Sequence, residues 1–167
     1  MSQRAPWILI ALLLAACGPA VRGTTAATTD RPAPDFTAKR LDGGTFQLST
    51  LRGRVVVLDI WATWCEGCEK ELPVLDDLAA RLTPLDATVV SVSIDENPND
   101  ALRFLRARAW KMTAVYDPSG RTGDSYSPPK MPAVFVIDRA GVIRDTRYSL
   151  RPDDLTVIEA LVRALSQ

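Results

Sequence analysis

Two cysteines three positions apart, Cys65 and Cys68, are the residues of this sequence best suited to chemistry. They follow the apolar run 55–61 closely, so we expect them where a buried strand passes into a helix. Thiols at this spacing lie on one helical face and can close a disulfide. Unpaired backbone N–H groups and the positive end of the helix dipole favour the thiolate of Cys65. The pair predicts two-electron thiol chemistry, because a permanent disulfide over so short a loop would constrain the chain little.

Two carboxyl groups near the cysteines could carry the protons that such chemistry moves. Asp59 lies six residues before Cys65 in the apolar run, and strand alternation could point it beneath the pair. Glu71 follows Cys68 by three residues, so one helical turn brings it to the same face. The sequence has no histidine, and a buried carboxyl with a raised pKa can exchange protons near neutral pH. We expect at least one of them to act, although Glu71 could also be a solvated helix residue.

The N-terminal part of the chain is expected to be a targeting segment followed by a tether. An apolar stretch from Trp7 to Ala16 follows Arg4 and is too short to span a bilayer. Its end, with Cys17 after small residues, resembles a bacterial lipoprotein signal, in which that cysteine carries the lipid; an ordinary signal peptide with an incidental cysteine is the alternative. We therefore expect a signal at 1–16, a disordered tether at 17–34 and a domain at 35–167, in a compartment outside the cytoplasm that permits disulfides.

Composition and periodicity predict one globular domain. Twenty basic and twenty acidic residues balance within 167 positions, which gives no support for nucleic-acid binding. Apolar runs and turn signals predict strands and helices in the order β-α-β-α-β-β-α. The strands are expected at 45–48, 55–61, 88–94, 133–137 and 142–148, and the helices at 66–82, from 97 to about 110 and from 153 onward. This order, with the cysteines after an early strand, resembles the thioredoxin arrangement.

The segment from Trp61 to Pro73 resembles the active-site region of the TlpA/ResA group of membrane-tethered extracytoplasmic thioredoxins. Ala33-Pro34-Asp35-Phe36 and the run 131–138 fit the same pattern, so the resemblance covers roughly residues 33–167. It implies an α/β, thioredoxin-like fold in which helices flank a central mixed sheet. It also implies an enzyme, a thiol–disulfide oxidoreductase, that needs no cofactor or metal of its own.

The resemblance assigns roles to individual residues. Cys65 would be the nucleophile and Cys68 the more buried resolving thiol. Thioredoxins place a buried acid at the position of Asp59, and ResA-like proteins carry a functional glutamate at that of Glu71. A cis-proline is expected at Pro132. Met131 before it, with Trp64 at the rim of the site, would contact the substrate.

The expected function is reduction of disulfides in exported proteins, for example in cytochrome c maturation. Electrons would come from a membrane thiol donor, and the protein would be held at the membrane by its lipid anchor. The same chemistry run backwards makes an oxidase, and the direction depends on the reduction potential. A Cu(I)-binding module on the two thiolates is an alternative from another class. A peroxiredoxin is excluded because its motif needs a threonine where this chain has Ala62.

Overall fold

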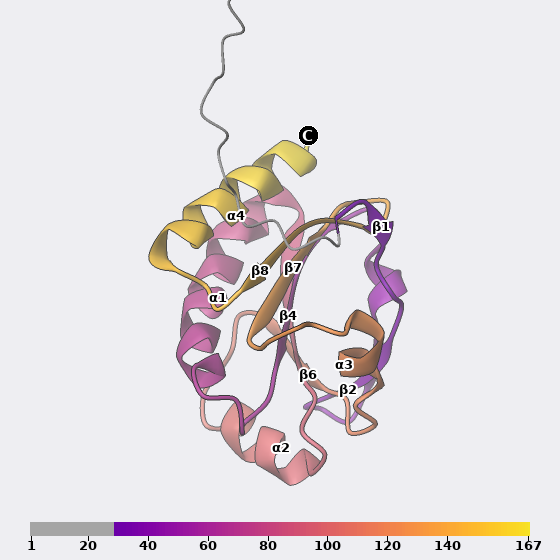
Figure 1. Cartoon of the computed structure of the whole chain (residues 1–167), viewed down its shortest axis with the longest axis vertical. Helices are drawn as coiled ribbons and strands as arrows, with labels where there is room; N and C mark the ends of the chain where they lie inside the picture. The colour runs from indigo at the N-terminus through magenta and orange to yellow at the C-terminus, as the bar shows by residue number, and fades with distance from the viewer. Residues whose placement is uncertain (1–28) are drawn as a thin grey trace, which may run out of the picture.

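An eight-stranded mixed sheet forms the centre of the protein in its computed structural model, which describes residues 29–167 (Figure 1). The order across the sheet is β1-β8-β7-β4-β5-β6-β2-β3. The strands are β1 (Arg31–Pro32), β2 (Thr37–Arg40), β3 (Thr45–Gln47), β4 (Val55–Trp61), β5 (Ala87–Ser93), β6 (Thr113–Tyr116), β7 (Ala133–Ile137) and β8 (Val142–Tyr148). Only the neighbouring pairs β4–β5 and β5–β6 of this described sheet are parallel, and the other pairs are antiparallel.

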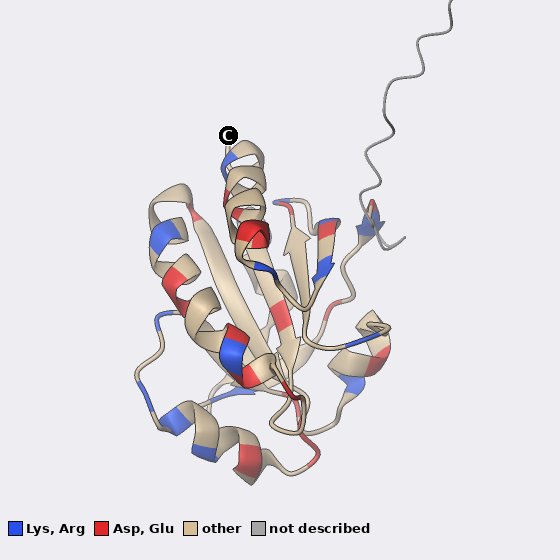
Figure 2. Cartoon of the chain, turned by 60° about the vertical axis from the view of Figure 1, so that its left-hand side comes forward, with Lys and Arg blue, Asp and Glu red and all other residues tan. Residues whose placement is uncertain are grey.

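Helices cover both faces of the sheet. They are α1 (Cys68–Leu82), α2 (Pro98–Arg106), α3 (Arg121–Tyr126) and α4 (Pro152–Leu165). Helices α1 and α4 lie together on one face, and α3 lies on the other (Figure 1). Leucine side chains of α1 and Ile158 of α4 share one apolar cluster, whereas Tyr126 of α3 packs in a second cluster with Phe36. Acidic and basic residues are interspersed on the outer surfaces of the helices (Figure 2).

Strand β4 positions the cysteines. All seven of its residues are buried, as a strand covered by helices on both faces requires. It pairs in parallel with β5 and antiparallel with β7, so it lies in the middle of the sheet. Its last residue, Trp61, is fully buried and packs against Phe104 with ring centroids 5.2 Å apart. The chain leaves the sheet after Trp61 and turns into α1, as the sequence predicts.

The expected elements are present, and four further ones were not predicted: β1, β2, β6 and α3. Three of them are strands of two to four residues, too short to show an alternating pattern. Helix α3 has six residues and contains Gly123, a residue that favours helices poorly. Each therefore depends on neighbours that lie far away in the sequence.

Three boundaries also differ from the predicted ones by more than one residue. Helix α2 ends at Arg106 rather than near Trp110, because the indole of Trp110 donates a hydrogen bond to the carbonyl of Leu105 (2.8 Å) that another helical turn would use. Helix α1 begins at Cys68 rather than Glu66. Strand β1 precedes the domain start expected at Asp35, since it pairs with β8 and is followed by the buried Ala33.

Candidate active site

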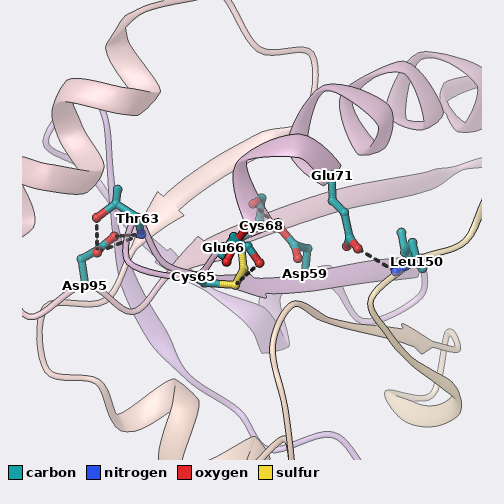
Figure 3. Close-up of a disulfide and its surroundings, with 9 residues drawn as sticks. Asp59, Thr63, Cys65, Glu66, Cys68, Glu71, Asp95 and Leu150 are labelled. Carbon is teal, nitrogen blue, oxygen red and sulfur yellow. Dashed lines mark hydrogen bonds between the residues drawn. A yellow bond between two sulfur atoms is a disulfide. The ribbon is translucent and has the colours of Figure 1, made fainter.

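Cys65 and Cys68 form a disulfide at the end of β4, where the sheet meets the first turn of α1 (Figure 3). Their Sγ atoms are 2.02 Å apart and their Cα atoms 5.5 Å apart. Gly67, between them, precedes the helix with a φ of 102°, a conformation that glycine adopts without steric cost. Cys65 is 8 % exposed and Cys68 is 1 % exposed. The order of accessibility agrees with an attacking Cys65 and a resolving Cys68.

Asp59 lies beneath the cysteines, where strand alternation placed it. It is 1 % exposed, and its Oδ2 accepts a hydrogen bond of 2.7 Å from the hydroxyl of Ser91 on the neighbouring β5. Its Oδ1 is buried without a hydrogen-bond partner among the described residues. Burial raises the pKa of Asp59 to about 7; the Ser91 hydrogen bond opposes this, and the charge of Glu71 adds to it. Such a group gains and loses a proton near neutral pH.

Glu71 points from α1 toward the same interior, with Asp59 between it and the disulfide (Figure 3). Its Oε1 accepts a hydrogen bond of 2.6 Å from the backbone N–H of Leu150, while its Oε2 is buried and unpaired within residues 29–167. Burial raises the pKa of Glu71; the Leu150 hydrogen bond opposes the shift, and the charge of Asp154 adds to it. The alternative of a solvated helix residue is therefore wrong.

The Met131–Pro132 peptide bond is cis, as expected from the resemblance. The carbonyl of Pro132 accepts a hydrogen bond of 3.1 Å from the backbone N–H of Ser149. The next residue, Leu150, is the one that donates to Glu71. One short corner between β8 and α4 thus holds both the cis-proline and the acid on α1. The sequence contains no signal for this corner, because it joins three distant segments.

A groove of about 630 Å³ reaches the turn that carries the cysteines, although the cysteines themselves do not line it. Trp64, which is 66 % exposed and bonded to Cys65, forms part of one wall. Met131 also lines the groove, so the two residues expected to contact the substrate face the same hollow. The other lining residues follow β5 or lie in α3 and in the loops on either side of it, among them Ile94 and Asp124. The volume is in the range of sites that bind small ligands or a few residues of a peptide.

Sequence reasoning missed Asp95, which lies two residues after the end of β5 and is 4 % exposed. Its carboxylate accepts hydrogen bonds from the N–H and the hydroxyl of Thr63, two residues before Cys65 (Figure 3). One signal could have found it: polar residues at the carboxyl ends of adjacent parallel strands come together at one edge of a sheet. The expected lipidation site, Cys17, lies outside the described residues.

Comparisons with known proteins agree with this geometry. Residues 29–146 match the AhpC/TSA family. The thiol-disulfide oxidoreductase ResA of Geobacillus thermodenitrificans is 28 % identical over 142 residues, which are 82 % of this chain and 82 % of that protein. A crystal structure described as a thiol:disulfide interchange protein, DsbE, from Chlorobium tepidum is 32 % identical with a TM-score of 0.77, covering 85 % of this chain and all of the other, 100 %. The exposed lipoprotein thioredoxin of Streptococcus pneumoniae is 26 % identical with a TM-score of 0.68, covering 79 % of this chain and 100 % of that one.

The family match, the named relatives and the fold shared with known structures all agree with a redox disulfide between Cys65 and Cys68. The chain belongs to the AhpC/TSA family and is a thiol–disulfide oxidoreductase of the TlpA/ResA-like thioredoxin type.

Proposed function

We propose that this protein reduces disulfides in other proteins outside the cytoplasm while tethered to a membrane. The observation that carries the proposal is the Cys65–Cys68 disulfide beside a groove that Trp64 and Met131 line. A polypeptide lying in this groove would pass Trp64, the residue bonded to Cys65. The cis-bonded Pro132 would then place the backbone of Met131 against the substrate, as the resemblance implies.

The reaction transfers two electrons from the reduced pair to the substrate. The thiolate of Cys65 attacks one sulfur of the substrate disulfide, that bond breaks, and the first substrate thiolate leaves. Cys68 then loses its proton and attacks the Sγ of Cys65, which releases the second substrate thiolate. The Cys65–Cys68 disulfide forms, and both substrate thiolates end as thiols by taking up the proton from Cys68 and one from the solvent, to which Cys65 had lost its own. Cys68 suits the second step because it is almost completely buried and its Sγ lies within bonding distance of the Sγ of Cys65.

Asp59 and Glu71 are proposed to accept the proton that Cys68 gives up. Both carboxyls lie on the same side of the sheet as the pair, and the pKa of each is raised by burial. Each has one buried oxygen that has no hydrogen-bond partner in the described part of the chain. Asp59, whose pKa is about 7, can take a proton from the thiol near neutral pH and return it later, and the raised pKa of Glu71 favours the same role.

Glu71→Gln is expected to slow resolution of the mixed disulfide about tenfold at neutral pH, since a positioned base typically contributes at least that much. The amide oxygen of glutamine can still accept the hydrogen bond from Leu150, so the structure is kept while the base is lost. Single-turnover reduction of insulin from pH 5 to 9 measures the effect. Glu69→Gln, an exposed residue of the same helical turn, is the control. Equal rates in all three proteins would show that Glu71 takes no part.

The membrane tether is proposed from the sequence and from one relative. Lipidation at Cys17 would anchor the chain, and the residues between Cys17 and β1 would separate the domain from the bilayer. The similar exposed lipoprotein thioredoxin of Streptococcus pneumoniae supports this arrangement. Within residues 29–167, no helix has the length and apolar character that a membrane span requires. A membrane thiol donor is the proposed source of electrons, and apocytochrome c is one proposed client.

The reduction potential of the Cys65–Cys68 pair tests the proposed direction. A reductase is expected to show a potential near that of thioredoxin, roughly −270 mV, and an oxidase a value well above it, toward roughly −120 mV. Equilibration with dithiothreitol buffers gives this value. In parallel, the pre-reduced protein should reduce insulin. A protein that neither reduces insulin nor exchanges with dithiothreitol would not be the proposed enzyme.

A further inference from the structure

The turn that carries the cysteines is joined to the end of β5 beyond the last pair of the sheet. The parallel pairing of β4 with β5 ends at Trp61 and Ser93. The N–H of Ile94 then donates to the carbonyl of Trp61 (2.9 Å), which extends the backbone contact by one residue. Beyond these residues the two backbone segments separate, and the side chain of Asp95 links them through hydrogen bonds from Thr63.

Both oxygens of Asp95 take part. Oδ1 accepts from the N–H of Thr63 (3.0 Å) and from its hydroxyl (2.7 Å). Oδ2 accepts from the same N–H (3.2 Å) and from the hydroxyl of Ser93 (2.6 Å). All of these donors are neutral, and they stabilise a carboxylate that is 4 % exposed. Asp95 therefore connects Thr63, in the loop before the cysteines, to Ser93 at the end of β5.

The two segments joined by Asp95 form neighbouring walls of the groove beside the disulfide. Trp64 follows Thr63, and Ile94 and Glu96 flank Asp95; all three line the groove. The side chain of Ile94 packs closely against α3: a Cβ atom added at Gly123 would lie 3.0 Å from the Cδ1 of Ile94. The position of the Trp64 wall relative to Ile94 therefore depends on the hydrogen bonds between Thr63 and Asp95.

We propose that Asp95 is a positioning residue for protein substrates. By holding Thr63 it sets the spacing between Trp64 and Ile94, and thereby the width of the groove in which a client polypeptide lies next to Cys65. This inference rests on the proposed reduction of protein disulfides. A small disulfide reaches Cys65 without filling the groove, so its reduction does not depend on Asp95.

The test compares insulin with a small aromatic disulfide as substrates of the pre-reduced protein. Asp95→Ala is expected to raise KM for insulin about tenfold and to leave kcat and the small-disulfide rate within about twofold, because loss of a buried hydrogen-bonded anchor displaces one wall. Thr63→Val keeps the backbone N–H but removes the hydroxyl, so KM should rise about threefold. Asp77→Ala, an exposed carboxylate of α1, is the matched control and should behave like the wild type.

Two conservative variants separate positioning from charge. Asp95→Asn keeps an oxygen that can accept from Thr63, and Thr63→Ser keeps the hydroxyl, so both should restore KM for insulin to within about twofold of wild type. Equal impairment of Asp95→Asn and Asp95→Ala would show that charge matters rather than position. An equal decrease in kcat/KM for insulin and for the small disulfide would show that Asp95 acts on Cys65 itself.

Thermal unfolding of each variant identifies those that fail to fold, and Thr63→Val tests the inference if Asp95→Ala does not fold. If the KM for insulin is unchanged in both Asp95→Ala and Thr63→Val, the positioning role of Asp95 is overturned while the proposed function stands. A wild-type protein that reduces neither substrate would overturn the proposed function together with it.

Discussion

Replacement of Cys65 by serine is expected to lower kcat/KM for protein disulfides by roughly three orders of magnitude or more, because a hydroxyl is a far weaker nucleophile than a thiolate. Cys65 is the more accessible of the two sulfurs and adjoins the groove through Trp64, so no other described thiol can take its place at the substrate. Reduction of insulin by the pre-reduced protein, followed by turbidity, measures the loss.

Cys68→Ser provides the matched variant. It should still perform the first attack but not the second, so it should accumulate a mixed disulfide between Cys65 and the client. The adduct should disappear on addition of dithiothreitol and should be absent from the Cys65→Ser/Cys68→Ser double variant. An adduct attached through Cys68 in the Cys65→Ser protein would mean that the assignment of nucleophile and resolving thiol is reversed.

The stability of the oxidised protein is expected to fall as the pH rises from about 4 to 7, and Asp59 is the main cause. The pKa of Asp59 is about 7 in the folded chain, against 3.8 for the unperturbed group. Between these values the folded protein holds a proton that the unfolded chain has lost, so raising the pH favours unfolding. At about 1.4 kcal/mol per unit, the loss approaches roughly 4 kcal/mol and is complete above pH 7. Glu71, whose pKa is also raised, contributes with the same sign.

Asp59→Asn should remove most of this pH dependence. At pH 4 the variant should be less stable than the wild type, because its buried amide group has no partner at the position of Oδ1. At pH 8 it should be more stable, because the wild type then carries a buried charge that asparagine lacks. Urea denaturation at intervals between pH 4 and 8 measures both curves. Glu69→Gln, at an exposed position, should keep the wild-type slope. A wild-type protein whose stability is constant or rises across this range would show that Asp59 is ionised throughout.

Features that depend on local sequence were predictable, and features that depend on distant contacts were not. The apolar run 55–61 is a buried strand, and the predicted hairpin of β7 and β8 is present, because period and turn chemistry are local properties. The partner of Glu71, by contrast, lies 79 residues away at Leu150, and Asp95 meets Thr63 across 32 residues. Such pairs follow from the way the strands are ordered in the sheet.

The peroxiredoxin alternative also depends on local sequence, at the position of Ala62. Peroxidase chemistry calls for a threonine hydroxyl at the position of Ala62. Here the backbone carbonyl of Ala62 accepts a hydrogen bond from the N–H of Cys65 at 3.1 Å, and the side chain of Ala62 is a methyl group without a hydroxyl. The hydroxyl of the neighbouring Thr63 donates to Asp95 instead. The thiols are thus left to react with each other and with a substrate disulfide.

The short pairing of β1 with β8 has a consequence for how the enzyme meets its partners. Strand β1 pairs with Val142 and Ile143, at the level of the beginning of β4, whereas the disulfide lies beyond the other end of β4. The chain therefore enters the domain at the pole opposite the redox pair, separated from it by the length of β4, about 20 Å. In a lipid-anchored protein this orientation turns the reactive pole away from the bilayer. With the proposed anchor, exported clients would meet this pole directly, whereas a donor embedded in the membrane would have to reach the pole that faces away from it.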